Sequence, residues 1–127
     1  MIRQEGILIL SGGLTIHNLR DRASFDEATA SPLHKQFDQA LLDAVSTIDV
    51  RPRSRHSRFF LYVANFFLQP VARKQALIDL TEHPGFRPSH PREDHFIPVY
   101  IAAGAGESGD VKTIAGIYGA PTFAFGL

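Results

Sequence analysis

A glycine-containing loop holds the first residues whose types could do chemistry. The stretch SGGLTIHNLR, Ser11 to Arg20, follows the apolar run Gly6 to Leu10 and contains two adjacent glycines and His17. It lacks the lysine and the serine or threonine of a Walker A motif, and its glycine spacing does not match the dinucleotide fingerprint. Open α/β sheets bind ligands where their strands end, which is where His17 would stand. His17 is therefore a candidate for acid/base chemistry, and a structural loop histidine is the alternative.

A second candidate group is the stretch HPREDH, which begins at His90 and ends at His95. On one continuous helix these two histidines would lie about 140° apart around the axis. They therefore cannot form the i, i+4 metal pair of an HExxH motif. If Pro91 opens a helix, His95 belongs to its first turn and faces the end that the loop of His17 approaches. His95 is a candidate ligand, and a partly exposed first-turn histidine is the alternative.

The elements that must position these residues indicate an α/β fold. The apolar run Gly6 to Leu10 predicts a strand buried on both faces. A helix is predicted to begin with Ser31 as N-cap and Pro32 at its first position. Its apolar face has residues at spacings of three and four, namely Leu33, Phe37, Ala40, Leu41, Ala44, Val45 and Ile48.

The second half of the chain predicts two more helices and a β tail. One helix follows Pro70, ends at Pro84-Gly85 and buries a side formed by Ala72, Ala76, Leu77 and Leu80. The next starts with Ser89 or His90 as cap, ends at Gly104 or Gly106 and is kinked at Pro98. The tail from Val111 to Leu127 predicts one or two strands. The other histidines, His34, His56 and His83, are expected at the surface, in an inserted segment and at a helix end, without chemistry.

Composition excludes several classes of function for this chain of 127 residues. Thirteen basic and thirteen acidic residues balance, so no overall field favours nucleic acid or an anionic membrane. The longest apolar stretch, Phe59 to Leu68, is about half of a membrane span, and the N-terminus does not match a signal peptide. The absence of cysteine suits a reducing compartment, so a cytoplasmic location is expected.

The stretch Val50 to Gln69 does not fit its surroundings. It starts with four arginines without an acidic residue and continues as an aromatic apolar run. Joining Asp49 directly to Pro70 would give a well-capped helix start. Valine codons begin with GT and a glutamine codon can end in AG, as an intron does. Two interpretations stay open: a translated, unspliced intron inserted at residues 50–69, or a genuine helix or surface loop.

Several stretches, read together and in order, resemble the C-terminal half of a known family. They are EGILILSGGLTIHNLR, FDEA, FDQAL, HPREDHFIPVYIAAGAG and YGAPTFAFG. Their pattern is similar to that of the class III extradiol ring-cleavage dioxygenases, which are LigB-like, and within them to fungal enzymes of the DOPA-dioxygenase type. The resemblance covers residues 1–127 except the stretch Val50 to Gln69. It implies part of a three-layer sandwich, with a mixed central sheet flanked by helices.

The resemblance also implies roles for individual residues. His17 matches the acid/base histidine of the family, and His95 matches a histidine that binds the metal. Asn18, Gly12, Gly13 and His90 would lie close to the metal or the substrate without binding the metal. The implied reaction opens a catechol-type ring with O2, using Fe(II), with Zn(II) as a possible occupant.

One departure from the family limits what the chain is expected to do. The family's other two metal-binding histidines belong to its N-terminal half, which these residues do not match. The chain by itself is therefore expected to bind metal weakly and to have no appreciable dioxygenase activity. Two functions stay open: a part of a dioxygenase, or a non-catalytic α/β domain that works through binding.

Overall fold

The computed structural model describes residues 8–47, 72–107 and 109–127 of the chain. The stretch Val50 to Gln69 and the junction between Asp49 and Pro70 lie outside these residues. The described elements are, in order, the 3-10 turn η2 (Arg22–Phe25), α1 (Pro32–Ser46), a helix over residues 72–79, the 3-10 turn η3 (Leu80–Glu82), α3 (Phe86–Ser89), α4 (Ile97–Ala105), β1 (Val111–Ala115) and β2 (Thr122–Phe125).

The predicted start of α1 is confirmed, with Ser31 as N-cap and a proline in the first turn. The hydroxyl of Ser31 lies 3.0 Å from Nδ1 of His34. The prediction that His34 lies at the surface was wrong, because it is 3% exposed. His34 lies three residues before Phe37 and seven before Leu41, so helical periodicity places it on the buried face.

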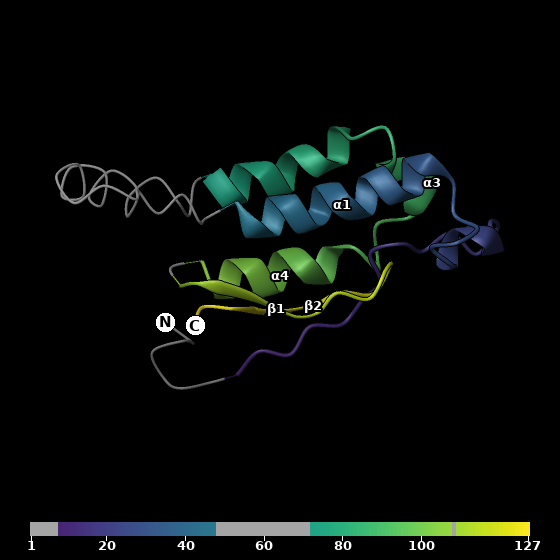
Figure 1. Cartoon of the computed structure of the whole chain (residues 1–127). Helices are drawn as coiled ribbons and strands as arrows, with labels where there is room; N and C mark the ends of the chain where they lie inside the picture. The colour runs from purple at the N-terminus through teal and green to yellow at the C-terminus, as the bar shows by residue number, and fades with distance from the viewer. Residues whose placement is uncertain (1–7, 48–71, 108) are drawn as a thin grey trace, which may run out of the picture.

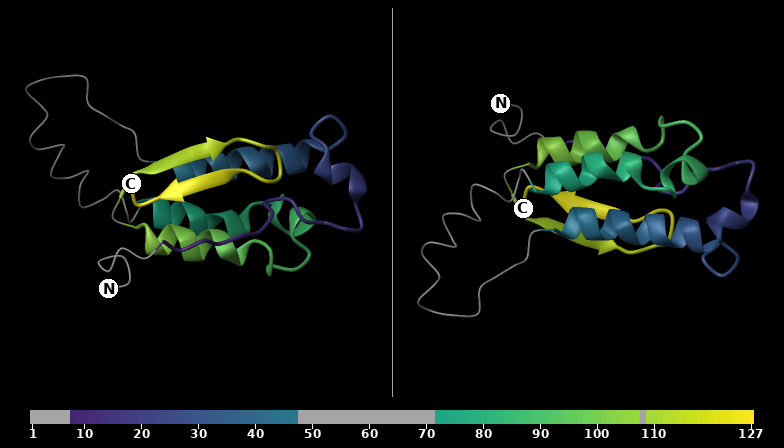
Figure 2. Two further views of the ribbon diagram at one scale, coloured as in Figure 1. Left: turned by 90° about the horizontal axis from the view of Figure 1, so that it is seen from below. Right: turned by 90° about the horizontal axis from the view of Figure 1, so that it is seen from above.

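The helices cover one face of the sheet (Figures 1 and 2). α1 packs against β1 and α4 packs against β2. The helix over residues 72–79 runs alongside α1, farther from the sheet (Figure 1). The α/β class predicted from the sequence is confirmed. A single core joins these elements, formed by Ile16, Phe37, Leu41, Ala44, Val45, Leu77, Leu80, Phe86, Phe96 and Ala103.

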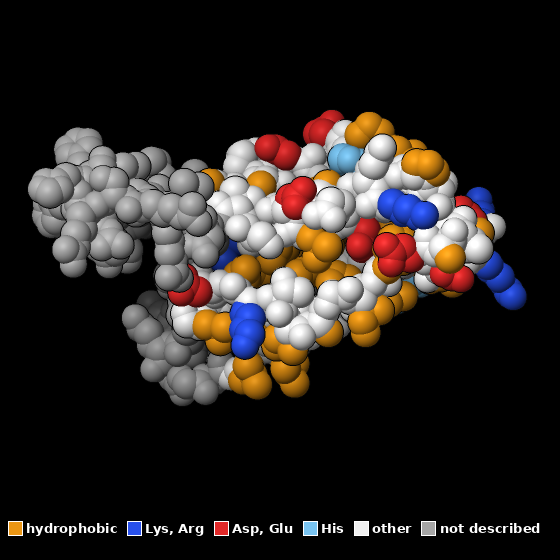
Figure 3. Space-filling model, in the orientation of Figure 1, with side chains coloured by type: hydrophobic (Ala, Val, Ile, Leu, Met, Phe, Trp, Pro, Cys, Tyr) orange, Lys and Arg blue, Asp and Glu red, His pale blue; other side chains and the backbone are white. Residues whose placement is uncertain are grey.

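The sheet that the described residues form consists of β1 and β2 paired antiparallel. Val111 pairs with Phe125 at one end, and the register shifts between Thr113 and Ala115 at the other. The face of the sheet away from the helices carries exposed side chains, and Ile114 is 63% exposed. Hydrophobic side chains are visible along this lower side of the molecule in Figure 3.

The prediction of a buried strand over Gly6 to Leu10 was wrong for the three residues of it that the structure describes. Residues 8–10 have no strand structure, and Leu8 and Leu10 are 80% and 85% exposed. A strand needs hydrogen-bonding neighbours, and within the described residues β1 and β2 pair with each other. The apolar composition of residues 8–10 is therefore not sufficient to make them a strand.

The helix predicted to start near Ser89 begins later in the chain. Ser89 ends α3, His90 is its C-cap, and α4 starts only at Ile97. His90 precedes a proline, which disfavours the helical backbone at that position. Pro98 lies in the first turn of α4, where its missing N–H needs no partner, so the expected kink does not arise. The predicted end at Gly106 is confirmed.

The helix over residues 72–79 ends before Pro84, as predicted. Its buried side is rotated around the helix axis relative to the predicted one. Ala72 is exposed, whereas Arg73 is 3% exposed. The guanidinium of Arg73 donates to the carbonyl oxygens of Glu107 and Gly109 at 2.9 and 3.1 Å. These bonds connect the helix to the segment between α4 and β1, and they explain why an arginine takes a buried place.

Candidate active site

Three hydrogen bonds fasten the loop that carries His17 to the end of α3. The loop residues and their partners run in opposite directions, as they do in an antiparallel pair of strands. The bonds are Thr15 O to His90 Nε2 at 2.7 Å, His17 N to Ser89 O at 2.8 Å and Asn18 Nδ2 to Pro88 O at 2.8 Å. The backbone of His17 is therefore fixed against the segment that leads to His95.

The other side of the same loop is bound by the turn between β1 and β2. The N–H groups of Thr15 and Ile16 both donate to the carbonyl oxygen of Gly119, at 2.9 and 3.3 Å. Gly119 has φ = 72°, a left-handed conformation that favours glycine. Its own N–H donates to Oδ1 of Asp38 at 3.1 Å, and the hydroxyl of Thr15 donates to the same oxygen at 3.2 Å. Asp38 of α1 thus joins three elements.

The structure brings His17 and His95 together. Their rings stack with centroids 3.8 Å apart and planes inclined by 26°. His17 is half-buried and also meets the edge of Phe25, whereas His95 is exposed. Because α4 starts at Ile97, His95 lies just before this helix and not in its first turn.

The two glycines of the loop have different surroundings. A Cβ atom on Gly13 would overlap the carbonyl oxygen of His95 and crowd Pro98, whereas one on Gly12 would meet open space. The structure therefore requires glycine at position 13, where the loop passes close to the backbone of His95. It gives no comparable steric reason for glycine at position 12.

His90 lies in the interior, whereas His17 is half-buried and His95 is exposed. It is 0% exposed and its ring contacts those of Phe37, Phe86 and Phe96. Burial lowers the pKa of His90, the bond to Thr15 opposes that shift, and the nearby His17 and His95 lower it further. His90 is thus neutral near pH 7, which suits a place among aromatic rings.

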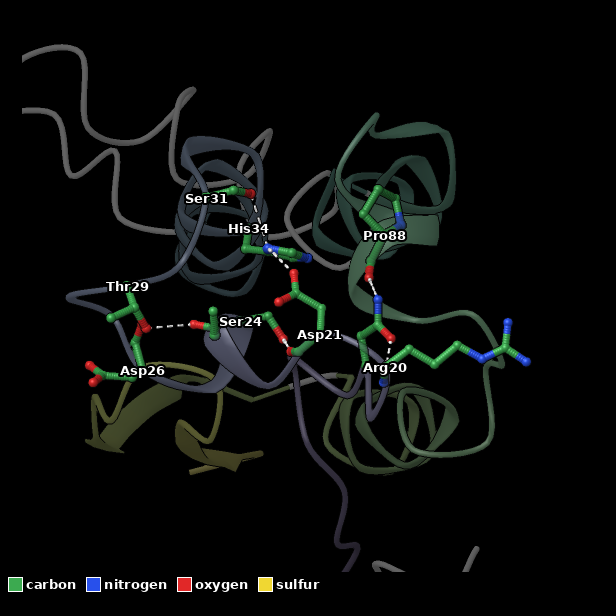
Figure 4. A network of polar contacts seen from close by, with 10 residues as sticks. Arg20, Asp21, Ser24, Asp26, Thr29, Ser31, His34 and Pro88 are labelled. Atoms are coloured by element: carbon green, nitrogen blue, oxygen red, sulfur yellow. Dashed lines mark hydrogen bonds and ion pairs between the residues drawn. The ribbon is translucent and has the colours of Figure 1, made fainter.

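Asn18 uses its side chain to hold the loop together. Its Oδ1 accepts a bond from the N–H of Arg20 at 3.1 Å, while its Nδ2 donates to Pro88. Figure 4 shows these bonds and, beside them, the contacts of His34 with Ser31 and Asp21. One end of the Asn18 amide is bonded within the loop and the other to α3, so the structure gives Asn18 a positioning function.

A small groove lies between the loop, α4 and β2. It has a volume of about 210 Å³, which is below the ~300–1,000 Å³ of most ligand pockets. Its lining includes Gly12, Gly13 and His95, together with Pro98 and Phe123. His95 therefore stands between this groove and the ring of His17.

Asp38, which was not among the residues predicted from the sequence, is 7% exposed and holds the turn of Gly119. Burial raises its pKa above the ordinary value, and the bonds from Gly119 and Thr15 oppose that shift. One signal was available: Asp38 lies three residues before Leu41 and seven before Val45, on the buried face of α1. A carboxylate at such a position needs donors from elsewhere in the fold.

Comparisons with known proteins identify the family of this chain. Residues 2–126 match the family described as the catalytic LigB subunit of aromatic ring-opening dioxygenase. The chain belongs to this family. It is also 38% identical over 126 residues to a 4,5-DOPA dioxygenase extradiol-like protein of Schizosaccharomyces pombe. The resemblance found in the sequence is thereby confirmed. No solved structure matches the chain.

The S. pombe relative is much longer than this chain. The match covers 99% of the chain but 35% of the relative. The chain thus spans about a third of the length of the curated protein that it matches. Among the described residues, no helix is long and apolar enough to cross a bilayer.

Membership of the LigB family raises the question of whether the residues present fit a metal ion. The described residues contain no group of three His, Cys, Asp or Glu side chains placed to hold one. An imidazole binds a metal through a lone pair in the plane of its ring, and the nearly parallel rings of His17 and His95 do not converge on one point. The described residues therefore do not fit a complete metal site.

Proposed function

We propose that this chain carries part of an extradiol ring-opening site, which acts on a catechol-type aromatic compound and O2. The observation that carries the proposal is the stacked pair of His17 and His95, two histidines from distant segments of the sequence. Support comes from the family match and from the name of the S. pombe relative. Within this site we assign acid/base chemistry to His17 and metal binding to His95.

The setting of His17 suits proton transfer. An imidazole can take and return a proton near neutral pH. The ring of His17 is half-buried beside an exposed neighbour, and its backbone is fixed by the bond to Ser89. In the proposed reaction His17 removes a proton from a hydroxyl of the catechol and later returns it to the opened product.

The metal of the proposed site is Fe(II), with Zn(II) as the alternative. His95 would supply one ligand, and the other ligands would come from parts of the family domain that this chain does not cover. The share of the relative that remains unmatched, together with the lack of a three-ligand group among the described residues, supports this division. Residues 1–127 would then be a C-terminal part of the catalytic domain.

An oxygen-uptake assay with simple catechols tests the proposal. It compares this chain with a version extended upstream by the missing family segment. We expect uptake by the extended form and none by the chain, which should also retain little iron after dialysis. Tight, stoichiometric iron in the isolated chain would contradict the division of the site.

Substitutions in the extended form then test the two roles. His17→Gln should lower turnover by about 10²- to 10⁴-fold, the usual contribution of a general acid/base group. His95→Gln should lower the metal content as well as the turnover. His83→Asn is the matched control, because asparagine can still accept the N–H of Gly85 that Nδ1 of His83 accepts. Unchanged turnover in His17→Gln would refute the acid/base role.

A non-catalytic binding domain is the second candidate function. The uncovered face of the sheet favours it, because Ile114 and Ile117 are 63% and 64% exposed there and in the adjoining turn. The same assay separates the two functions. Absence of oxygen uptake in a folded, iron-loaded extended form would favour binding over catalysis.

We also propose that the stretch Val50 to Gln69 is a translated intron that is foreign to the family domain. The support is its composition and the capped helix start that the sequence would have if the stretch were removed. Sequencing genomic DNA and transcript across this stretch tests the proposal. Codons without a GT start or an AG end, or a mature transcript that keeps the stretch, would contradict it.

A further inference from the structure

His90 occupies a place in the core where an apolar residue would fit. It is fully buried, with its ring centroid 4.9 Å from that of Phe96 and 5.8 Å from that of Phe86. A histidine in such surroundings retains a polar atom that must be desolvated. Some interaction of the imidazole therefore has to offset that cost.

The hydrogen bond of His90 determines which ring nitrogen carries the proton. Nε2 lies 2.7 Å from the carbonyl oxygen of Thr15, and a carbonyl oxygen can only accept. Nε2 must therefore donate, and in the neutral ring Nδ1 is left as a bare acceptor. Nδ1 is buried without a hydrogen-bond partner among the described residues. Such an unpaired atom is unfavourable in the core. The bond to Thr15 is therefore the favourable interaction that histidine makes here and that phenylalanine would lack.

The hydrogen bond from His90 holds the loop close to His17. Thr15 is two residues before His17, and the N–H of His17 donates to Ser89, the residue next to His90. One short segment thus fixes the loop on both sides of Ile16. The same segment continues to His95, whose ring stacks on that of His17.

We propose that His90 is a positioning residue for His17, which it places against His95 by donating from Nε2 to the carbonyl oxygen of Thr15. The geometric part of this inference stands without the proposed function. The meaning of the placement for catalysis rests on the acid/base role proposed for His17. His90 thus has a definite task, although it does not belong to the stacked pair of His17 and His95.

Two substitutions separate the donor from the packing. In His90→Gln the amide nitrogen can reach the place of Nε2 and donate to Thr15, although the ring is lost. In His90→Phe the aromatic packing is kept, the unpaired Nδ1 is removed, and the donor is lost. A purely structural role in the core predicts that His90→Phe is the milder change. A positioning role predicts that His90→Gln is the milder change for the loop.

The readouts are local and are made on the chain itself by NMR. We expect His90→Phe to raise the hydrogen-exchange rate of the His17 amide by about tenfold or more and to abolish the cross-peak between the rings of His17 and His95. His90→Gln should keep both close to their values in the unsubstituted chain. Normal exchange and an intact cross-peak in His90→Phe would overturn the proposal, as would their loss in both variants.

A third measurement needs no substitution, so it decides the matter even if His90→Phe does not fold. The ¹⁵N chemical shifts of the His90 ring should show a neutral imidazole at pH 7, with Nε2 protonated and Nδ1 unprotonated. A ring protonated at Nδ1 and not at Nε2 would overturn the proposal. All three readouts are independent of oxygen uptake, so a failure of the proposed function would leave their outcome unaffected.

Discussion

Two adjacent parts of the N-terminal segment differ sharply in their surroundings. Residues 8–10 are apolar and exposed, with Leu8 and Leu10 more than three quarters accessible. A few residues later, Ile16 is 0% exposed and belongs to the core. Both parts consist of residues that favour burial, so hydrophobicity does not explain the difference.

The difference lies in the partners of the backbone. The N–H groups of Thr15 and Ile16 both donate to Gly119, and the carbonyl oxygen of Thr15 accepts from His90. Buried backbone groups must be paired, and the turn between β1 and β2 together with the end of α3 supplies the partners. A segment of this chain joins the core where other segments supply hydrogen-bond partners for its backbone. The stacking of His17 on His95 depends on the part of the loop that has such partners, Thr15 and Ile16.

The largest effect should come from truncating the two apolar residues that define the contrast. Ile16→Ala should lower the free energy of unfolding by about 2–5 kcal/mol, because it opens a cavity in the core. Leu10→Ala should change it by less than about 0.5 kcal/mol, because Leu10 is 85% exposed. Urea unfolding measures both, and equal losses would show that residues 8–10 are buried in solution.

The next effect concerns the two glycines between these regions. Gly13→Ala should lower the free energy of unfolding by about 3 kcal/mol, because its methyl group would overlap the carbonyl oxygen of His95. Gly12→Ala should be neutral or stabilising by up to about 1 kcal/mol, because its methyl group meets open space. Thermal unfolding of the two variants provides the comparison. Similar melting temperatures would contradict the close approach at Gly13.

A smaller effect is expected at Asp38, which holds the turn that receives the loop. Asp38→Ala should lower the free energy of unfolding by about 2 kcal/mol, because the donors Thr15 and Gly119 lose their acceptor. Asp38→Asn keeps an acceptor oxygen and should cost less. Urea unfolding of both variants at pH 7 measures this difference, and an equal cost would show that the acceptor does not matter.

The pH dependence of Asp38→Asn follows from the raised pKa of Asp38 in the folded state. Folding favours the protonated carboxyl of Asp38. Its contribution to the free energy of unfolding is therefore complete below the ordinary pKa of 3.8 and is lost as the pH rises through the folded-state pKa. The stability of Asp38→Asn relative to the unsubstituted chain should therefore improve from about pH 3 to pH 7. A change in the opposite direction would contradict the burial of this carboxyl.

The smallest effect is expected at Tyr118, next to Gly119. Burial, reinforced by the nearby carboxylates, raises the pKa of Tyr118 to about 12. Absorbance near 295 nm should show this tyrosine ionising at about that pH, with its contribution to stability present below pH 10 and lost through pH 12. Tyr118→Phe should change stability by less than about 1 kcal/mol, because the hydroxyl has no partner among the described residues. A large loss would show that the side chain of Tyr118, and not the backbone of Gly119, holds the loop.

Local rules predicted the parts of the fold that depend on neighbours in sequence. Ser31 and Pro32 began α1, Gly106 ended α4, and the tail formed strands. Each of these depends on capping or on backbone preferences within a few residues. The order of the histidines, glycines and prolines along the chain also carried the family resemblance.

Predictions failed where a distant partner was decisive. The apolar run ending at Leu10 has no strand pairing in its described residues. Arg73 is buried because the carbonyl oxygens of Glu107 and Gly109, far along the chain, accept its hydrogen bonds. Neither of these outcomes is determined by spacing within a single segment. The burial of His34 and the start of α4 at Ile97 are different, because the periodicity of α1 and the proline after His90 were local signals for them.

The sequence by itself determined the family, the start of α1 and the two histidines worth comparing. Only the tertiary structure decided that His17 and His95 stack, that His90 faces inward and that Gly13, unlike Gly12, has no room for a side chain. The physical reason is that capping and periodicity act over a few residues. Ring stacking, burial and the pairing of backbone groups instead require segments that only the folded chain brings into contact.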